Sequence, residues 1–137
     1  MKIFKTMAVA LLLSSVFVAC SKDSDTTSNE VPKNTGIEGK YVGKHGFDNE
    51  TPNEDFILNI KAGGVFQEIG TSSGNPTGQG TWHLTGNKLT AEYKMLFSPY
   101  NEYRVSLIYD ATAKKLAGTW GFDGSYTDGG KMDVKKQ

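Results

Sequence analysis

The chain has 137 residues, of which 37% are hydrophobic and 22% charged, so its length suits one domain with a single core. The 15 basic and 15 acidic side chains balance, which removes any net-charge argument for a nucleic-acid partner. One cysteine is too few for an internal disulfide or a cysteine zinc cluster. The 16 glycines, without collagen-like spacing, indicate many turns.

The first 19 residues have the pattern of an export signal. Lys2 and Lys5 precede a largely apolar run from Met7 to Ala19. This run is shorter than the roughly 20 apolar residues that span a bilayer core. We therefore predict a secretory signal over residues 1–19, removed after export.

Cys20 directly follows this run, in the sequence Phe17-Val18-Ala19-Cys20. The tetrapeptide resembles the lipobox of bacterial lipoproteins, in which a small residue precedes the cysteine. The resemblance implies cleavage before Cys20 and acylation of Cys20, and two or more lipid signals anchor a protein stably to a bilayer. The alternative is a free thiol in an exported protein. We expect an exported protein with a lipid anchor, held at the outer membrane on its periplasmic face or on the cell surface.

The segment after Cys20 is polar up to Gly36, with Val31 as its only apolar side chain. Such a composition cannot bury enough surface to fold, and it is typical of a flexible linker. The chain therefore divides into a signal peptide (1–19), a lipidated cysteine with its linker (20–36) and a folded domain (37–137).

From Ile37 onward, apolar residues recur at every second position, which is typical of half-buried strands. Two such rows are Leu89, Ala91, Tyr93, Met95 and Phe97, and then, after a turn at 98–101, Tyr103, Val105, Leu107 and Tyr109. The same pattern predicts eight strands in all, near 37–44, 55–61, 65–69, 79–84, 88–97, 102–110, 115–121 and 131–135. Short connections favour antiparallel neighbours in an up-and-down order.

Eight strands with one apolar face leave two exposed edges unless the sheet closes on itself. We therefore predict an all-β fold, a small eight-stranded antiparallel up-and-down barrel. A loose repeat supports this fold: Gly39-Lys40-Tyr41, Gly80-Thr81-Trp82 and Gly118-Thr119-Trp120. In each, the glycine would share a face with the aromatic residue and allow a close approach of neighbouring backbone or rings.

These motifs, with 56–64 leading into Val65-Phe66 and with Gly80 to Leu89, resemble the lipocalin-like domains of bacterial, Gram-negative lipoproteins. That family lies within the wider lipocalin, fatty-acid-binding and avidin group of barrels. The resemblance covers the chain from Ile37 to its C-terminus. It implies a barrel with one open end, and often an apolar ligand inside, without naming that ligand.

Five aromatic residues are predicted to point into the barrel: Tyr41, Trp82, Tyr93, Tyr103 and Trp120. The interior of an eight-stranded barrel is either filled by side chains or just wide enough for one small ligand, and both alternatives stay open. Buried hydroxyl and indole groups need partners, so these residues are the candidate ligand-binding residues. The first hypothesis is a membrane-anchored barrel that binds a small, partly apolar ligand. The alternative is a non-catalytic module that binds a protein or glycan through loops such as 47–55 and 97–103.

Catalytic and metal-binding patterns are weak. Gly70-Thr71-Ser72-Ser73-Gly74 has the spelling of a nucleophile elbow, but the following Asn75-Pro76 cannot start the helix that the elbow requires, so we predict a polar hairpin loop.

Two histidines and two acidic segments are candidate metal ligands. His45, placed just beyond the first strand, and His83 lack metal-ligand spacing and are predicted at the surface. The acidic residues of 48–55 and of 123–130 are predicted to be solvated loops, with calcium as the alternative, because neither has the EF-hand pattern. We predict no enzyme activity, no cofactor and no metal. The expected partners are the bilayer, through acylated Cys20, and a small apolar ligand.

Overall fold

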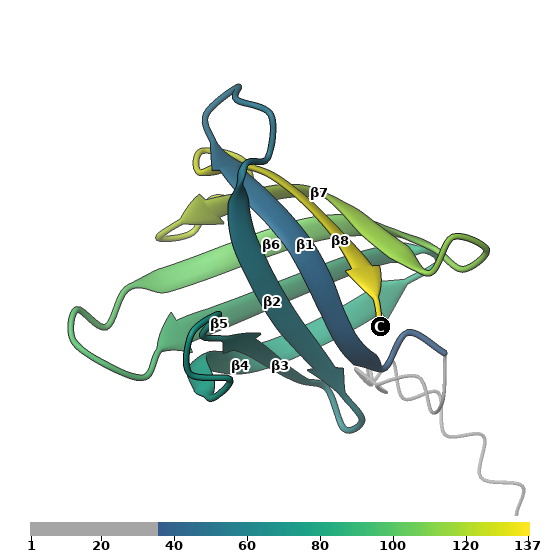
Figure 1. The fold of residues 1–137 in the computed structure, drawn as a ribbon, viewed down its shortest axis with the longest axis horizontal. Helices are drawn as coiled ribbons and strands as arrows, with labels where there is room; N and C mark the ends of the chain where they lie inside the picture. Colours follow the sequence, from purple (N-terminus) through teal and green to yellow (C-terminus); the bar gives the residue numbers. More distant parts are fainter. Residues whose placement is uncertain (1–35) are drawn as a thin grey trace, which may run out of the picture.

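The computed structural model describes residues 36–137, which form eight β-strands (Figure 1). The strands are β1 (Gly39–Phe47), β2 (Glu54–Lys61), β3 (Val65–Ile69), β4 (Pro76–Thr85), β5 (Lys88–Met95), β6 (Glu102–Asp110), β7 (Lys115–Phe122) and β8 (Gly130–Lys136). The predicted signal peptide, Cys20 and the linker as far as residue 35 lie outside the described residues. Over 36–137, no helix is long and apolar enough to cross a membrane.

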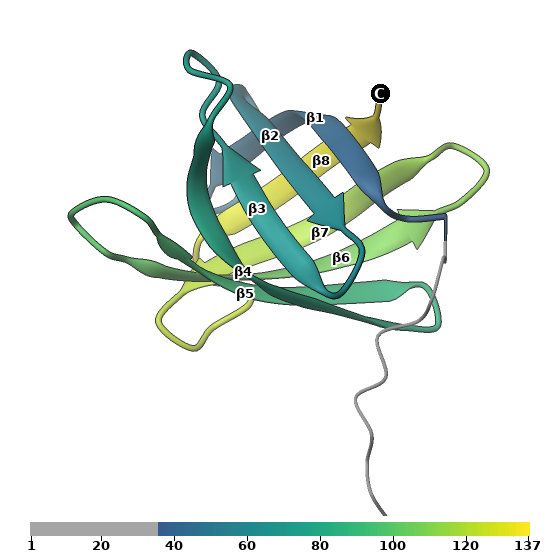
Figure 2. The same cartoon turned by 90° about the horizontal axis from the view of Figure 1, so that it is seen from below.

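Each strand pairs with the next one in antiparallel fashion, and β8 pairs with β1, so the sheet closes into a barrel (Figures 1 and 2). At this seam, Gly43 lies opposite Val134 and His45 opposite Met132. Closure gives partners to β1 and β8, which would otherwise be the exposed edges of the sheet. The predicted all-β fold and eight-stranded antiparallel barrel are therefore confirmed, and the architecture is consistent with a lipocalin-like fold.

Four strand ends differ from the sequence prediction by two or three residues, including the start of β1 at Gly39 rather than at residue 37, and the remaining ends agree within one residue. β1 continues to Phe47 rather than ending at residue 44, because β8 supplies a backbone partner along this stretch. β4 begins at Pro76 rather than at residue 79, and a proline is tolerated at the first position of a strand. β5 ends at Met95, so Phe97 lies in the β5–β6 loop with 64% of its surface exposed. The expectation that Phe97 continues the inner row was wrong.

The glycines of the Gly-x-aromatic repeat lie where strands approach closely. A Cβ on Gly80 would overlap the backbone of Glu92 across the β4–β5 pair, and one on Gly118 would overlap the backbone of Ser106. A residue with a side chain could not occupy either position without moving the neighbouring strand. The tryptophans two residues later are both buried in the core, so the predicted structural role is confirmed for these two members of the repeat, whereas a Cβ on Gly39 would meet only the side chain of Lys136.

One end of the barrel is filled with side chains, and we call it the packed half. Its fully buried residues are Ile37, Tyr41, Leu58, Phe66, Trp82, Leu89, Leu107 and Leu116. The described chain begins at this end, where the Tyr109 hydroxyl and Lys136 Nζ donate hydrogen bonds of 3.1 and 2.9 Å to the Gly36 carbonyl. The start of β1 therefore lies beside the C-terminus (Figure 1).

Candidate functional site

The opposite end of the barrel contains a cavity of about 310 Å³, and we call this end the hollow half. At about 30 Å³ per water, this volume corresponds to roughly ten water molecules. Its lining comes from all eight strands and the β3–β4 loop: His45, Phe47, Asp55, Phe56, Glu68, Ile69, Gly70, Thr71, Thr77, Tyr93, Met95, Tyr103, Trp120, Phe122 and Met132. Of the two alternatives left open by the sequence, the structure therefore shows an interior that is only partly filled.

Aromatic rings from β5, β6 and β7 form one continuous wall of the cavity. The rings of Tyr93 and Tyr103 stack with their centroids 5.4 Å apart, and Tyr103 is followed by Trp120 at 6.0 Å. Phe122 meets Trp120 edge-on at 5.1 Å. These residues are neighbours because the register places Tyr93 opposite Tyr103 and Tyr103 opposite Phe122. The wall offers ring faces and edges to an apolar ligand.

Two glycines hold rings of this wall close to the backbone. A Cβ on Gly78 would lie 2.8 Å from the Tyr93 ring, and a Cβ on Gly129 would lie 2.5 Å from the Trp120 ring. Because these glycines lack side chains, both rings can lie along the barrel wall instead of projecting across the interior. The space in the hollow half depends on this arrangement.

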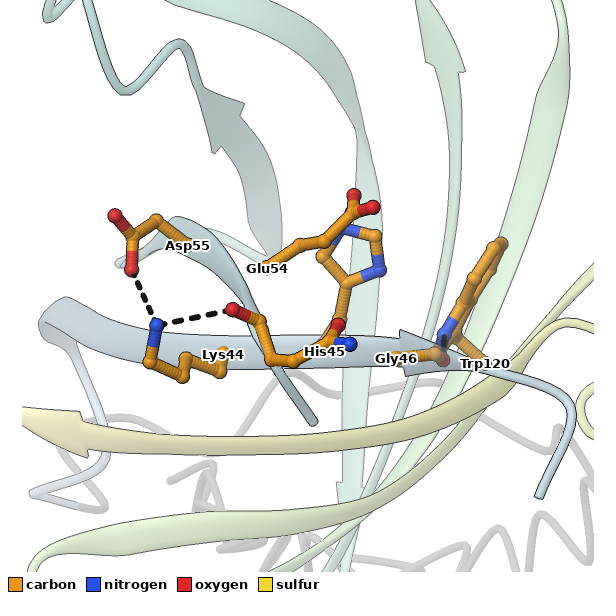
Figure 3. Close-up of polar contacts among 7 residues, drawn as sticks. Lys44, His45, Gly46, Glu54, Asp55 and Trp120 are labelled. Carbon is orange, nitrogen blue, oxygen red and sulfur yellow. Dashed lines mark hydrogen bonds and ion pairs between the residues drawn. The ribbon is translucent and has the colours of Figure 1, made fainter. Parts of the chain in front are cut away.

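His45 lies in β1 and faces the cavity, so its prediction as a surface residue beyond the first strand was wrong. Its ring packs edge-on against Phe56 at 5.3 Å and Trp120 at 5.4 Å. The His45 Nε2 atom lies 3.6 Å from a carboxylate oxygen of Glu54 (Figure 3). The error follows from the predicted strand end, because extending β1 by one pleat returns His45 to the inner row. His83, in contrast, is exposed on β4, as predicted.

The Trp120 ring is fixed by a hydrogen bond from its Nε1 atom to the Gly46 carbonyl, 3.0 Å away across the barrel seam (Figure 3). On the same stretch of β1, Lys44 Nζ bonds Asp55 at 2.9 Å and the Asn53 carbonyl at 3.0 Å. The Lys44 ammonium group is thus bonded to β2 and to the loop before it, and Lys44 does not line the cavity.

Glu68 brings a carboxylate to the interior of the hollow half. It belongs to the inner row of β3, because it lies two residues after the fully buried Phe66 and opposite Leu58. The Thr77 hydroxyl donates to Glu68 Oε1 at 3.2 Å. Burial raises the pKa of Tyr93 well above its ordinary value of 10.0, and the negative charge of Glu68 and a hydrogen bond to it raise it further. Glu68, Thr77 and Tyr93 therefore form one polar group inside the cavity.

Sequence analysis did not single out Glu68, although the signal was present. Alternation along β3 places Phe66 and Glu68 on one face, so a buried phenylalanine predicts an inward carboxylate two residues later. A charged side chain is usually expected at the surface. The Glu68 carboxylate is accommodated on the inner face of β3 because this part of the strand lines the cavity rather than the packed core.

All five aromatic candidates point into the barrel, but they do not form one site. Tyr93, Tyr103 and Trp120 line the cavity. Tyr41 and Trp82 are fully buried in the packed half, where the Tyr41 hydroxyl donates to the Ile37 carbonyl at 2.6 Å and Trp82 Nε1 to the Lys61 carbonyl at 2.9 Å. A role in ligand binding stays a prediction for the first three residues, whereas Tyr41 and Trp82 have no place in the cavity lining.

The mouth of the cavity carries exposed apolar side chains. Phe47 and Phe122 are 41% and 36% exposed at the ends of β1 and β7. In the β5–β6 loop, Leu96, Phe97 and Tyr100 are also exposed, Tyr100 to 69%. The open end thus presents apolar surface to solvent, in contrast to the predominantly charged and polar outer faces of the neighbouring strands.

The other candidate motifs lie in loops or at strand ends. The Gly70–Gly74 segment connects β3 to β4 as the predicted polar loop, with the Gly74 amide donating to the Gly70 carbonyl at 2.8 Å. Glu54 and Asp55 belong to β2 rather than to an acidic loop. Over residues 36–137, no group of three or more histidine, cysteine or acidic side chains is arranged to hold a metal ion.

Comparisons with known proteins returned no relative of this chain: no family model matches it, and no match was found among the curated proteins or the solved structures.

Proposed function

We propose that this protein binds a small, partly apolar ligand in the cavity of its hollow half, as a bacterial lipoprotein anchored to the outer membrane through acylated Cys20. The observation that carries the ligand proposal is the cavity itself, about 310 Å³ in volume, with aromatic walls and a few convergent polar groups. Small-molecule sites have this composition, and their volumes begin at about 300 Å³. The mouths of β-barrels are common places for them.

The position of the N-terminal end supports the anchoring proposal. The described chain starts at Gly36, which is bonded to Tyr109 and Lys136 at the packed end. A lipid anchor at Cys20 would therefore attach the barrel by the end opposite to the mouth. Ligand could then reach the hollow half from the side facing away from the attachment point.

Binding can be tested with N-phenyl-1-naphthylamine, an uncharged apolar fluorophore that accepts energy from tryptophan. The full chain with Cys20→Ser keeps every barrel residue and removes the lipid site. We expect saturable binding with quenching of tryptophan emission. Met95→Phe, which adds bulk to the cavity lining, should weaken this binding by about tenfold, since it forces overpacking against the bound ring.

The matched control is Ile108→Phe, on the exposed outer face of β6, where 49% of the isoleucine surface is free. This variant should bind the fluorophore like the parent chain. Absence of saturable binding at high protein concentration, or equal binding by the Met95→Phe and Ile108→Phe chains, would reject the ligand proposal.

The anchor has its own test. Bacterial expression of the unaltered chain with labelled palmitate should yield a labelled protein in the membrane fraction, and Cys20→Ser should abolish the label. Labelling of the Cys20→Ser chain, or absence of label on the unaltered chain, would contradict the proposed acylation.

A second candidate function rests on the β5–β6 loop, where Leu96, Phe97 and Tyr100 expose apolar surface beside the mouth. Such patches mark interaction sites when they are contiguous. A module that binds a protein or glycan through this loop should lose capture on a glycan array or from envelope extract after Tyr100→Ala. The same capture should survive Met95→Phe, which alters only the cavity. The reverse pattern would favour the ligand-binding barrel.

A further inference from the structure

We infer that the ligand is a cationic amphiphile, an amine attached to a ring-sized apolar body, and that Glu68 is its counter-ion. This inference rests on the proposed function and adds the charge of the ligand to it. It is drawn from the position of the Glu68 carboxylate, from the charges of the cavity lining and from the aromatic wall beside them.

The Glu68 carboxylate has hydroxyl partners but no cationic one. Thr77 donates a hydrogen bond to it, and Tyr93 interacts with it through its hydroxyl. Among residues 36–137, no lysine, arginine or histidine forms an ion pair with Glu68. An ionised carboxylate accepts hydrogen bonds at about four lone-pair sites, so two hydroxyls leave acceptor capacity and the whole negative charge unmatched.

The remaining charges of the cavity lining have the same sign. Asp55 and Glu68 are both acidic, and the lining contains no lysine or arginine. Lys44, which adjoins the lining residue His45 in the sequence, is bonded to Asp55 at the mouth. The His45 Nε2 atom lies 3.6 Å from a carboxylate oxygen of Glu54. The field of the lining therefore favours a positive group and opposes a carboxylate ligand, and a group that enters a partly desolvated site feels this field more strongly than in water.

The wall beside Glu68 suits the rest of such a ligand. Tyr93 is both the hydroxyl partner of Glu68 and the first ring of the Tyr93–Tyr103–Trp120 wall. An ammonium group at Glu68 would lie close to the negative faces of these rings, which attract cations. An apolar body attached to that ammonium would extend along the same wall. A neutral donor could also bond to Glu68, but charge-assisted hydrogen bonds are roughly twice as strong as neutral ones.

Three matched probes test the charge: 1-naphthylmethylamine, 1-naphthalenemethanol and 1-naphthylacetate, each measured by its displacement of N-phenyl-1-naphthylamine from the Cys20→Ser chain. We expect the amine to bind at least about tenfold more tightly than the alcohol, and the carboxylate to bind most weakly. In the Glu68→Gln variant this preference should disappear, while binding of the neutral fluorophore stays the same. Glutamine keeps an acceptor for Thr77, and a thermal melt checks that the barrel is intact.

The control is Glu102→Gln, which removes the same charge from the outer face of β6 near the mouth, where Glu102 pairs with Lys94. It should keep the preference for the amine. Equal affinities of amine and alcohol in the parent chain, or an amine preference that survives Glu68→Gln, would overturn the inference and leave the ligand-binding barrel standing. Failure of the fluorophore itself to bind would instead reject the proposed function, and the inference with it.

Discussion

Both the packed half and the hollow half of the barrel contain buried tyrosine and tryptophan rings, yet the 310 Å³ cavity lies in the hollow half. Tyr41 and Trp82 are fully buried in the packed half and bond to backbone carbonyls. Trp120 in the hollow half also bonds to a backbone carbonyl, but the pKa of Tyr93 is raised by burial and then by the neighbouring carboxylate of Glu68. Aromatic content therefore does not distinguish a core from a binding site.

The halves differ in the residues that surround the aromatic rings. In the packed half, Trp82 and Tyr41 belong to one buried cluster with several leucines and with Ile37, and these side chains fill the interior. In the hollow half, Gly78 and Gly129 let Tyr93 and Trp120 lie against the wall. An interior position occupied by glycine removes a side chain and also lets a neighbouring ring turn aside, so both effects create volume.

The largest expected effect is the loss of a ring from the packed half. Trp82→Ala deletes a fully buried indole and its hydrogen bond to the Lys61 carbonyl. Replacement of a buried tryptophan by alanine costs about 3–5 kcal/mol, because the surrounding side chains cannot close the cavity that it leaves. Urea unfolding should therefore show a strongly lowered midpoint with an unchanged slope. A loss below about 1 kcal/mol would mean that the packed half can collapse around the gap.

A matched pair of truncations compares the halves directly. Leu107→Ala in the packed half should lower the free energy of unfolding by about 2–5 kcal/mol. Met95→Ala at the cavity should cost much less, about 1 kcal/mol, because part of the methionine surface already faces open space. Urea titrations of the two variants give the difference. Equal losses would show that the hollow half is as tightly packed in solution as the other end.

Substitution of Gly129 should have a smaller effect on the free energy of unfolding and should also weaken ligand binding. Gly129→Ala places a methyl group against the Trp120 ring and should push that ring towards the cavity. We expect a loss of about 1–3 kcal/mol, typical of overpacking, and weaker binding of N-phenyl-1-naphthylamine. In a Trp120→Leu background the same substitution should cost less, and a double-mutant cycle measures this coupling. Strict additivity would show that the methyl group does not act through the ring.

The fold could be predicted from the sequence because alternation and turns are local properties. The alternating apolar residues around Leu89 and around Tyr103 each predict one strand from that segment alone. Short loops between such strands favour antiparallel pairing of neighbours. Closure followed from the need to pair the two outer strands. Even so, alternation could not tell where β5 stops, because Phe97 has the residue type and spacing of an inner position but lies beyond the last ladder pair.

The site could be predicted only in part, because cavities depend on how far rows from different strands extend along the barrel. Tyr93 and Trp82 were equivalent in the sequence, and only the register places one beside Glu68 and the other among leucines. His45 was missed because the end of β1 is set by its ladder partners, Glu54 on β2 and Met132 on β8. The empty volume was not encoded in any single segment.

The smallest expected effect concerns Tyr41, whose pKa is raised above its ordinary value of 10.0, first by burial and then by the neighbouring Tyr109. Below about pH 10 the hydroxyl is neutral in both states, so its contribution to stability is fully present. Above that pH the unfolded chain releases the proton first, and stability falls as pH rises. Tyr41→Phe should cost about 1 kcal/mol near pH 8, for the lost bond to the Ile37 carbonyl, and should flatten this alkaline decline.

The same titration compares the halves a last time. Burial raises the pKa of Tyr93 as well, and the neighbouring Glu68 raises it further, so Tyr93→Phe should reduce the alkaline loss of stability and leave the part due to Tyr41. Urea unfolding from about pH 8 to about pH 11 would measure both, with Tyr100→Phe on the exposed loop as the control. Because Tyr41 and Tyr93 belong to different ends of the interior, the two substitutions should act additively. A strong coupling between them would mean that the packed and hollow halves respond to charge as one unit, and that the cavity is not independent of the core beneath it.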